Sequence, residues 1–229
     1  MSVITNIVIL ACFIGGAIAL WVIGSLRFTA VVERPKYSVL DKKSGYEIRE
    51  YEPYIVARTD VFGSFNRSLN GGFGIIANYI FGNNVSRRSE ITKESSHARN
   101  QQIENEKIPM AAPVISEKAT GLEMQGRYMI SFVMPSKYTL ETLPVPNDAR
   151  VKISQVRRHV AAAIKFSGYA TEKMVFHSRQ LLRQMLTRDN IKTKPGYKVA
   201  QYDPPFTFPL MKKNEGIIDL QYEDGVPEI

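Results

Sequence analysis

The sequence predicts an α+β domain in which antiparallel strands pack against two helices. Three observations support this fold class: two apolar stripes with helical spacing, several short alternating segments typical of strands, and an order of elements that occurs twice. The domain is expected over residues 46–229, after an apolar segment at 1–26 and a tether at 27–45.

The domain begins with two predicted strands, in which Tyr46 and Ile48 alternate with charged residues and Pro53 divides the run. Residues 84–107 are polar and have no sustained apolar period, so a long loop is expected there. Two further strands are predicted after this loop, in "APVISE" and "RYMISFVMP".

A helix is predicted between these two pairs of strands, over about Ser64–Phe81. Its apolar stripe consists of Phe65, Leu69, Phe73, Ile76 and Ile80. Gly71, Gly72 and Gly74 each lower the helix propensity by about 1 kcal/mol relative to alanine. Packing against the rest of the domain must therefore stabilise this helix.

The same order of elements recurs at an offset of 105 residues, when residues 47–63 are laid over residues 152–168. The matched positions are Ile48 and Ile153, Tyr51 and Val156, Ile55 and Val160, and Gly63 and Gly168. A second helix is predicted over about Thr171–Arg188, and strands in "YKVAQYD" and "EGIIDLQY" follow it. The domain is thus predicted to be a tandem of two strand–strand–helix–strand–strand units.

The N-terminal segment Val3–Gly24 contains no charged residue. Its 22 residues would span about 33 Å as a helix, which matches a hydrocarbon core of about 30 Å. We therefore expect an uncleaved membrane anchor that contacts lipid. The basic residues after it favour a cytoplasmic domain, although the opposite side stays open.

Two alternatives to an anchor remain open at this stage. Residues 17–19 (Ala-Ile-Ala) have the small side chains of a signal-peptide cleavage site, although residues 1–26 lack Lys and Arg. A lipoprotein processed at Cys12 is the other alternative. This single cysteine excludes an intramolecular disulfide.

The formal net charge is +8, and basic residues outnumber acidic ones twelve to three between residues 148 and 198. This excess fits a surface beside anionic lipid or an ordinary solvated face. Nucleic-acid binding is not expected, because no recognisable motif accompanies the charge. The chain also has no nucleophile elbow, phosphate loop or metal-ligand spacing, so an enzyme and a bound metal are not expected.

Five stretches, in order, resemble the hallmark segments of the SOUL haem-binding family. They are "YEIREYEPYIVA", "NYIFGNN", "KIPMAAPVI", "ISFVMPSKYTLETLPVPND" and "YDPPFTFPLMKKNE". The resemblance covers about residues 45–222, and Met-Ala-Ala-Pro-Val, close to the family's Met-Thr-Ala-Pro-Val, is its most specific part. It implies a distorted antiparallel β-barrel with two flanking helices that binds haem or another tetrapyrrole.

The resemblance places the ligand in a shallow apolar groove along the first helix and near the late loop that contains Met211. At about 100° per residue, one side of that helix presents Asn70, Phe73, Gly74, Ala77 and Phe81. The small Gly74 and Ala77 leave room for a flat ring. Alternatively, the glycines admit a close strand and Phe81 closes the end of the helix.

The chain departs from the family at the positions that would hold the ligand. Glu50 stands where some members carry a histidine suggested as an iron ligand, and Asn70 and Asn78 stand where haem binders carry basic residues. Arg67, Lys212 and Lys213 are candidates to replace these cations. The three histidines, His97, His159 and His177, are expected to be structural or solvated, so binding would rest on apolar contact.

We therefore predict a membrane-tethered binding protein for haem or a related tetrapyrrole. The alternative is an effector-binding or protein-interaction module for another small planar, amphipathic ligand. Pro109 and Pro113 exclude a regular helix in "KIPMAAPVI". This segment is predicted to be extended and to serve the core of the barrel or the wall of a ligand site.

Overall fold

The computed structural model describes residues 32–87, 104–119, 126–204, 206–223 and 226–227, together with seven scattered residues before position 25. Most of Val3–Gly24, residues 88–103 of the predicted polar loop and His97 lie outside this description.

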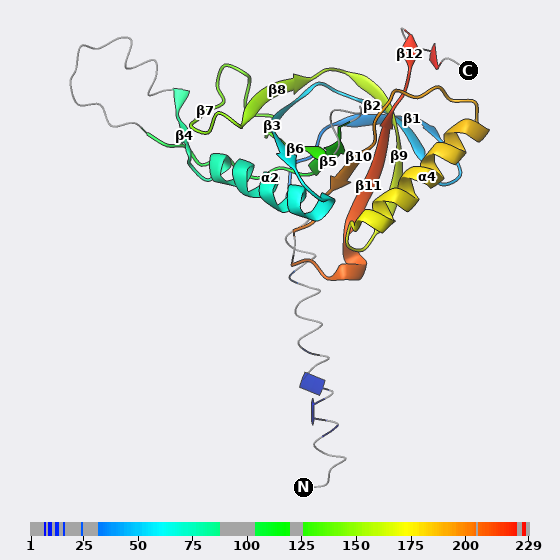
Figure 1. Ribbon diagram of the computed structural model, residues 1–229, viewed down its shortest axis with the longest axis horizontal. Helices are drawn as coiled ribbons and strands as arrows, with labels where there is room; N and C mark the ends of the chain where they lie inside the picture. The colour runs from blue at the N-terminus through cyan, green and yellow to red at the C-terminus, as the bar shows by residue number, and fades with distance from the viewer. Residues whose placement is uncertain are drawn as a thin grey trace, which may run out of the picture.

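The domain is built on one nine-stranded antiparallel sheet, in the order β1-β2-β9-β11-β10-β5-β6-β3-β8 (Figure 1). The strands are β1 (Tyr37–Lys42), β2 (Glu47–Tyr51), β3 (Tyr54–Phe62), β5 (Val114–Lys118), β6 (Arg127–Val133), β8 (Lys152–Val156), β9 (His159–Ser167), β10 (Lys198–Gln201) and β11 (Lys213–Asp219). Because β1 and β8 are the two edges and do not pair with each other, the curled sheet is a half-barrel. The predicted distorted β-barrel is therefore corrected to a half-barrel, whereas the α+β class with two helices is confirmed.

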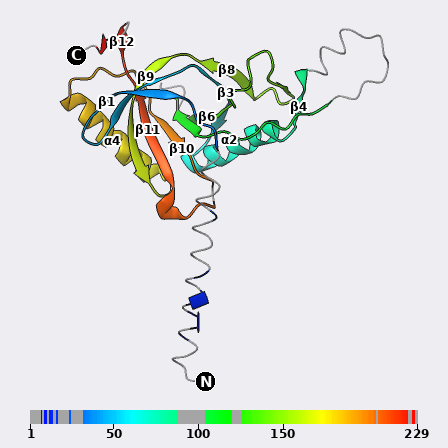
Figure 2. The ribbon, with the colours of Figure 1, turned by 180° about the vertical axis from the view of Figure 1, so that it is seen from behind.

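Two helices and two small ribbons complete the described elements. The helices are α2 (Phe65–Ile80) and α4 (Glu172–Arg188), with a short 3₁₀ turn, η2 (Pro209–Met211). The ribbons pair β4 (Asn84–Val85) with β7 (Val145–Pro146), and β12 (Tyr222–Glu223) with β13 (Val226–Pro227). The helices lie beside opposite halves of the sheet (Figure 2).

The repeat predicted from the sequence is visible in the strand order. Apart from β1, exchanging the strands of the first unit (β2, β3, β5, β6) with those of the second (β8, β9, β10, β11) gives the same order read from the opposite edge of the sheet. The units also exchange strands, because β2 pairs with β9 and β8 pairs with β3. Gly63 and Gly168 follow β3 and β9 with φ of +147° and +90°, a backbone region that favours glycine.

The strand register shows that both helices cover one face of the sheet, since directly opposed residues of antiparallel strands point to the same side. Val199 lies opposite Ser116, and Ser116 lies opposite Ile130. Val199 belongs to the core under α4, and Ile130 belongs to the core under α2. We call this side the helix face and the other side the open face.

Two sequence predictions about the N-terminal part need correction. The tether expected at 27–45 contains β1, whose residues pair with β2. No helix among the described residues is long and apolar enough to cross a membrane. This finding contradicts the membrane localisation predicted from Val3–Gly24.

The ends of the predicted polar loop are held by one buried side chain. Asn84 donates from Nδ2 to the carbonyl oxygens of Tyr79 (2.7 Å) and Glu106 (2.8 Å), and its Oδ1 accepts from the backbone of Glu106 (3.0 Å). The next segment, "KIPMAAPVI", is not helical: it has no regular structure up to Pro113, bends at Ala112, and enters β5 at Val114. Ala111 and Ala112 are buried in it, which supports the core role.

Candidate ligand-binding sites

The α2 residues predicted to form the groove divide into two sets. Arg67, Asn70, Gly74, Asn78 and Phe81 are all exposed, and their spacings of three and four residues place them along one face of the helix. We call this row the α2 stripe. A Cβ atom added at Gly74 would meet no atom within 4 Å, and Phe81 is 63% exposed. The stripe is therefore a shallow surface with a flat position at its centre.

The other two predicted groove residues on α2 face the core instead. Ala77 is only 8% exposed, and the Phe73 ring packs on Phe132 with 5.1 Å between ring centroids. Gly72 is also buried, and an added Cβ atom there would lie 2.4 Å from Cγ1 of Ile130. Both readings of the glycines thus apply: Gly72 admits a close strand, and Gly74 leaves an open surface.

The late loop places its predicted residues near the start of α4 rather than together on α2 (Figure 1). Lys212 is 7% exposed, donates to the carbonyl oxygen of Pro204 (2.7 Å) and lies 5.1 Å from the centre of the Tyr169 ring. Burial lowers the pKa of Lys212 below its ordinary value. Met211 is half-buried, whereas the Lys213 side chain is exposed. Lys212 is therefore already engaged, and Lys213 is free to meet a ligand.

The histidines and Glu50 differ in their surroundings. Glu50 forms an ion pair with Arg158 (3.1 Å), and His177 is exposed on α4. His159 stacks on Tyr51 at 5.2 Å, and its Nδ1 lies 2.8 Å from the carbonyl oxygen of Arg157. Burial lowers the pKa of His159, which favours the neutral ring. Within the described part of the chain, no three His, Cys, Asp or Glu side chains are grouped as metal ligands.

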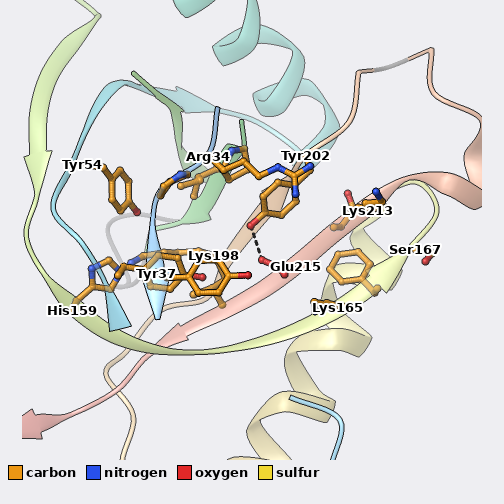
Figure 3. Close-up of a pocket in the computed structure, with 17 residues that line it drawn as sticks. Arg34, Tyr37, Tyr54, His159, Lys165, Ser167, Lys198, Tyr202, Lys213 and Glu215 are labelled. Atoms are coloured by element: carbon orange, nitrogen blue, oxygen red, sulfur yellow. Dashed lines mark hydrogen bonds between the residues drawn. The ribbon is translucent and has the colours of Figure 1, made fainter. Parts of the chain in front are cut away.

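A cavity of about 500 Å³ lies on the open face, and we call it the tyrosine pocket (Figure 3). Its lining residues are Arg34, Pro35, Tyr37, Tyr51, Tyr54, Pro113, Ile115, His159, Lys165, Phe166, Ser167, Lys198, Tyr202, Lys213, Asn214, Glu215 and Ile217. Of the predicted site residues, only Lys213 belongs to this wall. Pro113 of "KIPMAAPVI" also lines it, so that segment serves both the core and the pocket.

A buried ion cluster lies beside the tyrosine pocket and reaches its wall through Glu215 and Tyr202. The fully buried Arg49 guanidinium donates to both carboxylate oxygens of Glu215, at 2.8 and 2.9 Å, and to Glu47 at 2.7 Å. The Tyr202 hydroxyl donates to Glu215 at 2.6 Å. Burial opposes the charge on Arg49, but the hydrogen bonds and charge of Glu215 outweigh it and raise the arginine's pKa. Both carboxylate oxygens of Glu215 therefore already accept hydrogen bonds from the protein.

The sequence did not indicate this pocket, although one signal was present. The sequence predicts only that Tyr46 and Ile48 alternate with charged residues, and this alternation does not show whether the side of β2 with Glu47, Arg49 and Tyr51 is covered. The pairing of Arg49 with a residue 166 positions away covers that side. Burial also raises the pKa of Tyr51 to about 12, so its hydroxyl stays protonated.

The family assignment rests on most of the chain. A family model described as "SOUL heme-binding protein" matches residues 32–219. The chain belongs to the SOUL family. No curated protein matches the sequence.

Solved structures share the fold of this SOUL member at low sequence identity. The C-terminal domain of EcmrR aligns with a TM-score of 0.54 and 7% identity, over 82% of this chain and 99% of that domain. EcmrR in a DNA complex aligns with a TM-score of 0.52 and 7% identity, over 78% of this chain and 57% of that one. A hydrolase from Listeria innocua aligns with a TM-score of 0.45 and 12% identity, over 85% of this chain and 95% of that one. At 7% identity the likeness to EcmrR shows the fold alone.

Proposed function

We propose that this SOUL protein binds haem or a related tetrapyrrole on the α2 stripe and acts as a binding protein rather than an enzyme. The family supports a tetrapyrrole as the ligand class. The observation that carries the choice of surface is the open space at Gly74, with the exposed Phe81 ring farther along the same face. A flat ring can approach a helix closely at a residue without a side chain.

Apolar contact and one cation account for the binding. Covering one face of the macrocycle would remove about 200 Å² of apolar surface from water, which is worth about 5 kcal/mol. Association entropy offsets much of this gain, so we expect a dissociation constant no tighter than about 1 µM. Arg67, at the other end of the stripe, is placed to pair with a propionate.

The iron is expected to contribute little to affinity. Glu50 occupies the position of the family's suggested iron ligand and pairs with Arg158. His159 lines the tyrosine pocket on the open face, whereas α2 covers the helix face. No histidine lies on the α2 stripe, so the ring would be held without an axial histidine from this surface.

The test is an absorbance titration of the full chain with hemin and with iron-free protoporphyrin IX. Both are expected to bind, with dissociation constants within about threefold of each other. Gly74→Glu should weaken both at least about tenfold, because it covers the flat position and repels propionates. Gln180→Glu, which adds the same charge on the exposed side of α4, is the matched control and should have no effect.

Two results would overturn the proposal. Unchanged porphyrin binding by Gly74→Glu would place the ring elsewhere. Hemin binding far more tightly than protoporphyrin IX, with the difference removed by His159→Ala, would show that the iron is ligated from the open face.

A further inference from the structure

We propose that the tyrosine pocket is a second binding site, and that its ligand is a small planar aromatic carboxylate. This site lies on the open face, away from the α2 stripe, and the inference does not depend on tetrapyrrole binding. The volume of about 500 Å³ falls within the range of pockets that enclose small organic ligands.

The walls of the pocket favour a flat apolar body. Five aromatic side chains of the open face line it: Tyr37, Tyr51, Tyr54, His159 and Tyr202. The floor is low, because the alanines of the open-face cluster, Ala161, Ala163 and Ala200, come from the strands beneath. Aromatic rings that surround these small side chains leave a space in which a flat aromatic ligand can stack.

The charges of the lining favour an anion. Four basic side chains line the pocket against one acid, Glu215. Two of these bases already have partners, since Lys165 pairs with Glu47 (3.2 Å) and Lys198 pairs with Asp219 (2.6 Å). Arg34 and Lys213 are exposed and have no carboxylate partner within the described ranges. The pocket thus offers two cations without a counter-ion.

Both available cations lie near Tyr202, whose backbone donates to the carbonyl oxygen of Lys213 (3.2 Å). The Arg34 guanidinium lies 5.0 Å from the centre of the Tyr202 ring, and Figure 3 shows Tyr202 between Arg34 and Lys213. Tyr54 and His159 lie toward the other end of the pocket (Figure 3). A ligand stacked along these rings would therefore place its carboxylate at the Arg34 and Lys213 end, where a guanidinium can bind both oxygens.

The same geometry disfavours an aromatic cation. A cationic ligand would need Glu215, whose two oxygens accept from Arg49 and whose Oε2 also accepts from Tyr202. Replacing these donors would leave the buried Arg49 without its full complement of partners, which is costly.

The experiment uses isothermal titration of the full chain with three probes of the same shape: 2-naphthoate, neutral 2-naphthamide and cationic 2-naphthylmethylammonium. We expect 2-naphthoate to bind, the amide to bind at least about tenfold more weakly, and the cation to show no binding. Arg34→Ala and Lys213→Ala should each weaken 2-naphthoate about tenfold. Lys36→Ala is the matched control, because Lys36 lines the neighbouring cavity instead.

Three results would overturn this proposal: no binding of 2-naphthoate at millimolar concentration, equal affinity for the acid and the amide, or tighter binding of the cation. Equal effects of Arg34→Ala and Lys36→Ala would also overturn it. Gly74→Glu should leave 2-naphthoate binding unchanged, which separates this site from the α2 stripe. Competition between 2-naphthoate and protoporphyrin IX would instead show that the ring occupies the pocket, and would overturn the α2 assignment alone.

Discussion

The two helices occupy equivalent places in the repeat but are stabilised in different ways. At the start of α4, the Thr171 side chain accepts from the backbone of Met174 (3.3 Å), Glu172 lies in the first turn and Arg188 lies in the last. These are local signals of helix termini. At the start of α2, Ser64 makes no such side-chain bond, and neither end carries a favourable charge. Helix α2 therefore depends on its packing.

The buried rows of the helices show how that packing differs. In α4 the row is Ser178, Leu182 and Leu186; in α2 it is Gly72, Ile76 and Ile80. The Ser178 hydroxyl lies 2.7 Å from the Tyr197 hydroxyl, so a side chain fits between α4 and the sheet. The space at Gly72 is filled by Ile130, so α2 lies too close to β6 for any side chain there.

Corresponding strands of the two units also differ. Arg49 on β2 corresponds to Ser154 on β8, at the offset of 105 residues that relates the two strands. Arg49 holds the buried ion cluster of the tyrosine pocket, whereas Ser154 is a half-buried residue that carries no charge. The same sheet thus carries an ion cluster on the open face of the half that contains β2 and β9, and a tightly packed helix, α2, on the half that contains β6 and β3.

The largest expected effect comes from breaking the ion cluster with Arg49→Met. It leaves Glu215 and Glu47 without their main partner, and we expect the free energy of unfolding to fall by about 3–5 kcal/mol in urea titrations. Ser154→Ala, the counterpart in the other unit, should change it by less than about 0.5 kcal/mol.

A second variant keeps this test informative if Arg49→Met does not fold. Adding Glu215→Leu to Arg49→Met removes both charges, and an apolar pair in their place should restore much of the stability. If the double variant is no more stable than Arg49→Met, the cost is a loss of packing rather than an unpaired charge.

The helices were predictable from the sequence because their signals are local. The expected spans Ser64–Phe81 and Thr171–Arg188 differ from the observed α2 and α4 by one residue at one or both ends. The duplicated unit was also predictable, because its alternating strands and the glycines that follow them recur at a constant offset. Spacing of three and four residues is sufficient to show which side of a helix is apolar.

The open face was not predictable, because it depends on which strands are neighbours. Strand alternation separates two faces but does not show whether the polar one is covered. Exchange of β2 and β8 between the units brings Arg49 to Glu215, and no local pattern encodes that contact. Part of the α2 face was predictable: helical geometry places Gly74 and Phe81 on one side, but only the packing of α2 in the folded domain shows that Ala77 is buried.

A smaller effect is expected from adding one methyl group to either of two glycines of α2. Gly72→Ala should lower the free energy of unfolding by about 2 kcal/mol, because its Cβ atom would overlap the branched Cβ and Cγ1 of Ile130. Gly74→Ala should raise it by about 0.5–1 kcal/mol, because the site is open and alanine favours a helix. Equal effects of the two changes in urea titrations would show that α2 does not pack on β6 as described.

The smallest expected effect concerns acid stability at the end of α4. Asp189 caps this end, where a negative charge is unfavourable to the helix dipole, but it accepts from Arg188 (2.8 Å) and from the Tyr46 hydroxyl (2.6 Å). These hydrogen bonds, that of Arg188 first, lower the pKa of Asp189 to about 2 from an ordinary 3.8.

Because the folded-state pKa of Asp189 is the lower one, its contribution to stability is complete above about pH 4 and is lost as the pH falls toward 2. Asp189→Asn should flatten the dependence of the free energy of unfolding on pH between 4 and 2. Tyr46→Phe, which removes one donor without a change of charge, should flatten it in part, since Arg188 still pairs with Asp189. Phe81, at the matching end of α2, has no titrating side chain, so Phe81→Ala should leave that slope unchanged. A steeper slope in Asp189→Asn than in the native chain would show that the helix dipole, rather than the two hydrogen bonds, sets the pKa of this carboxylate.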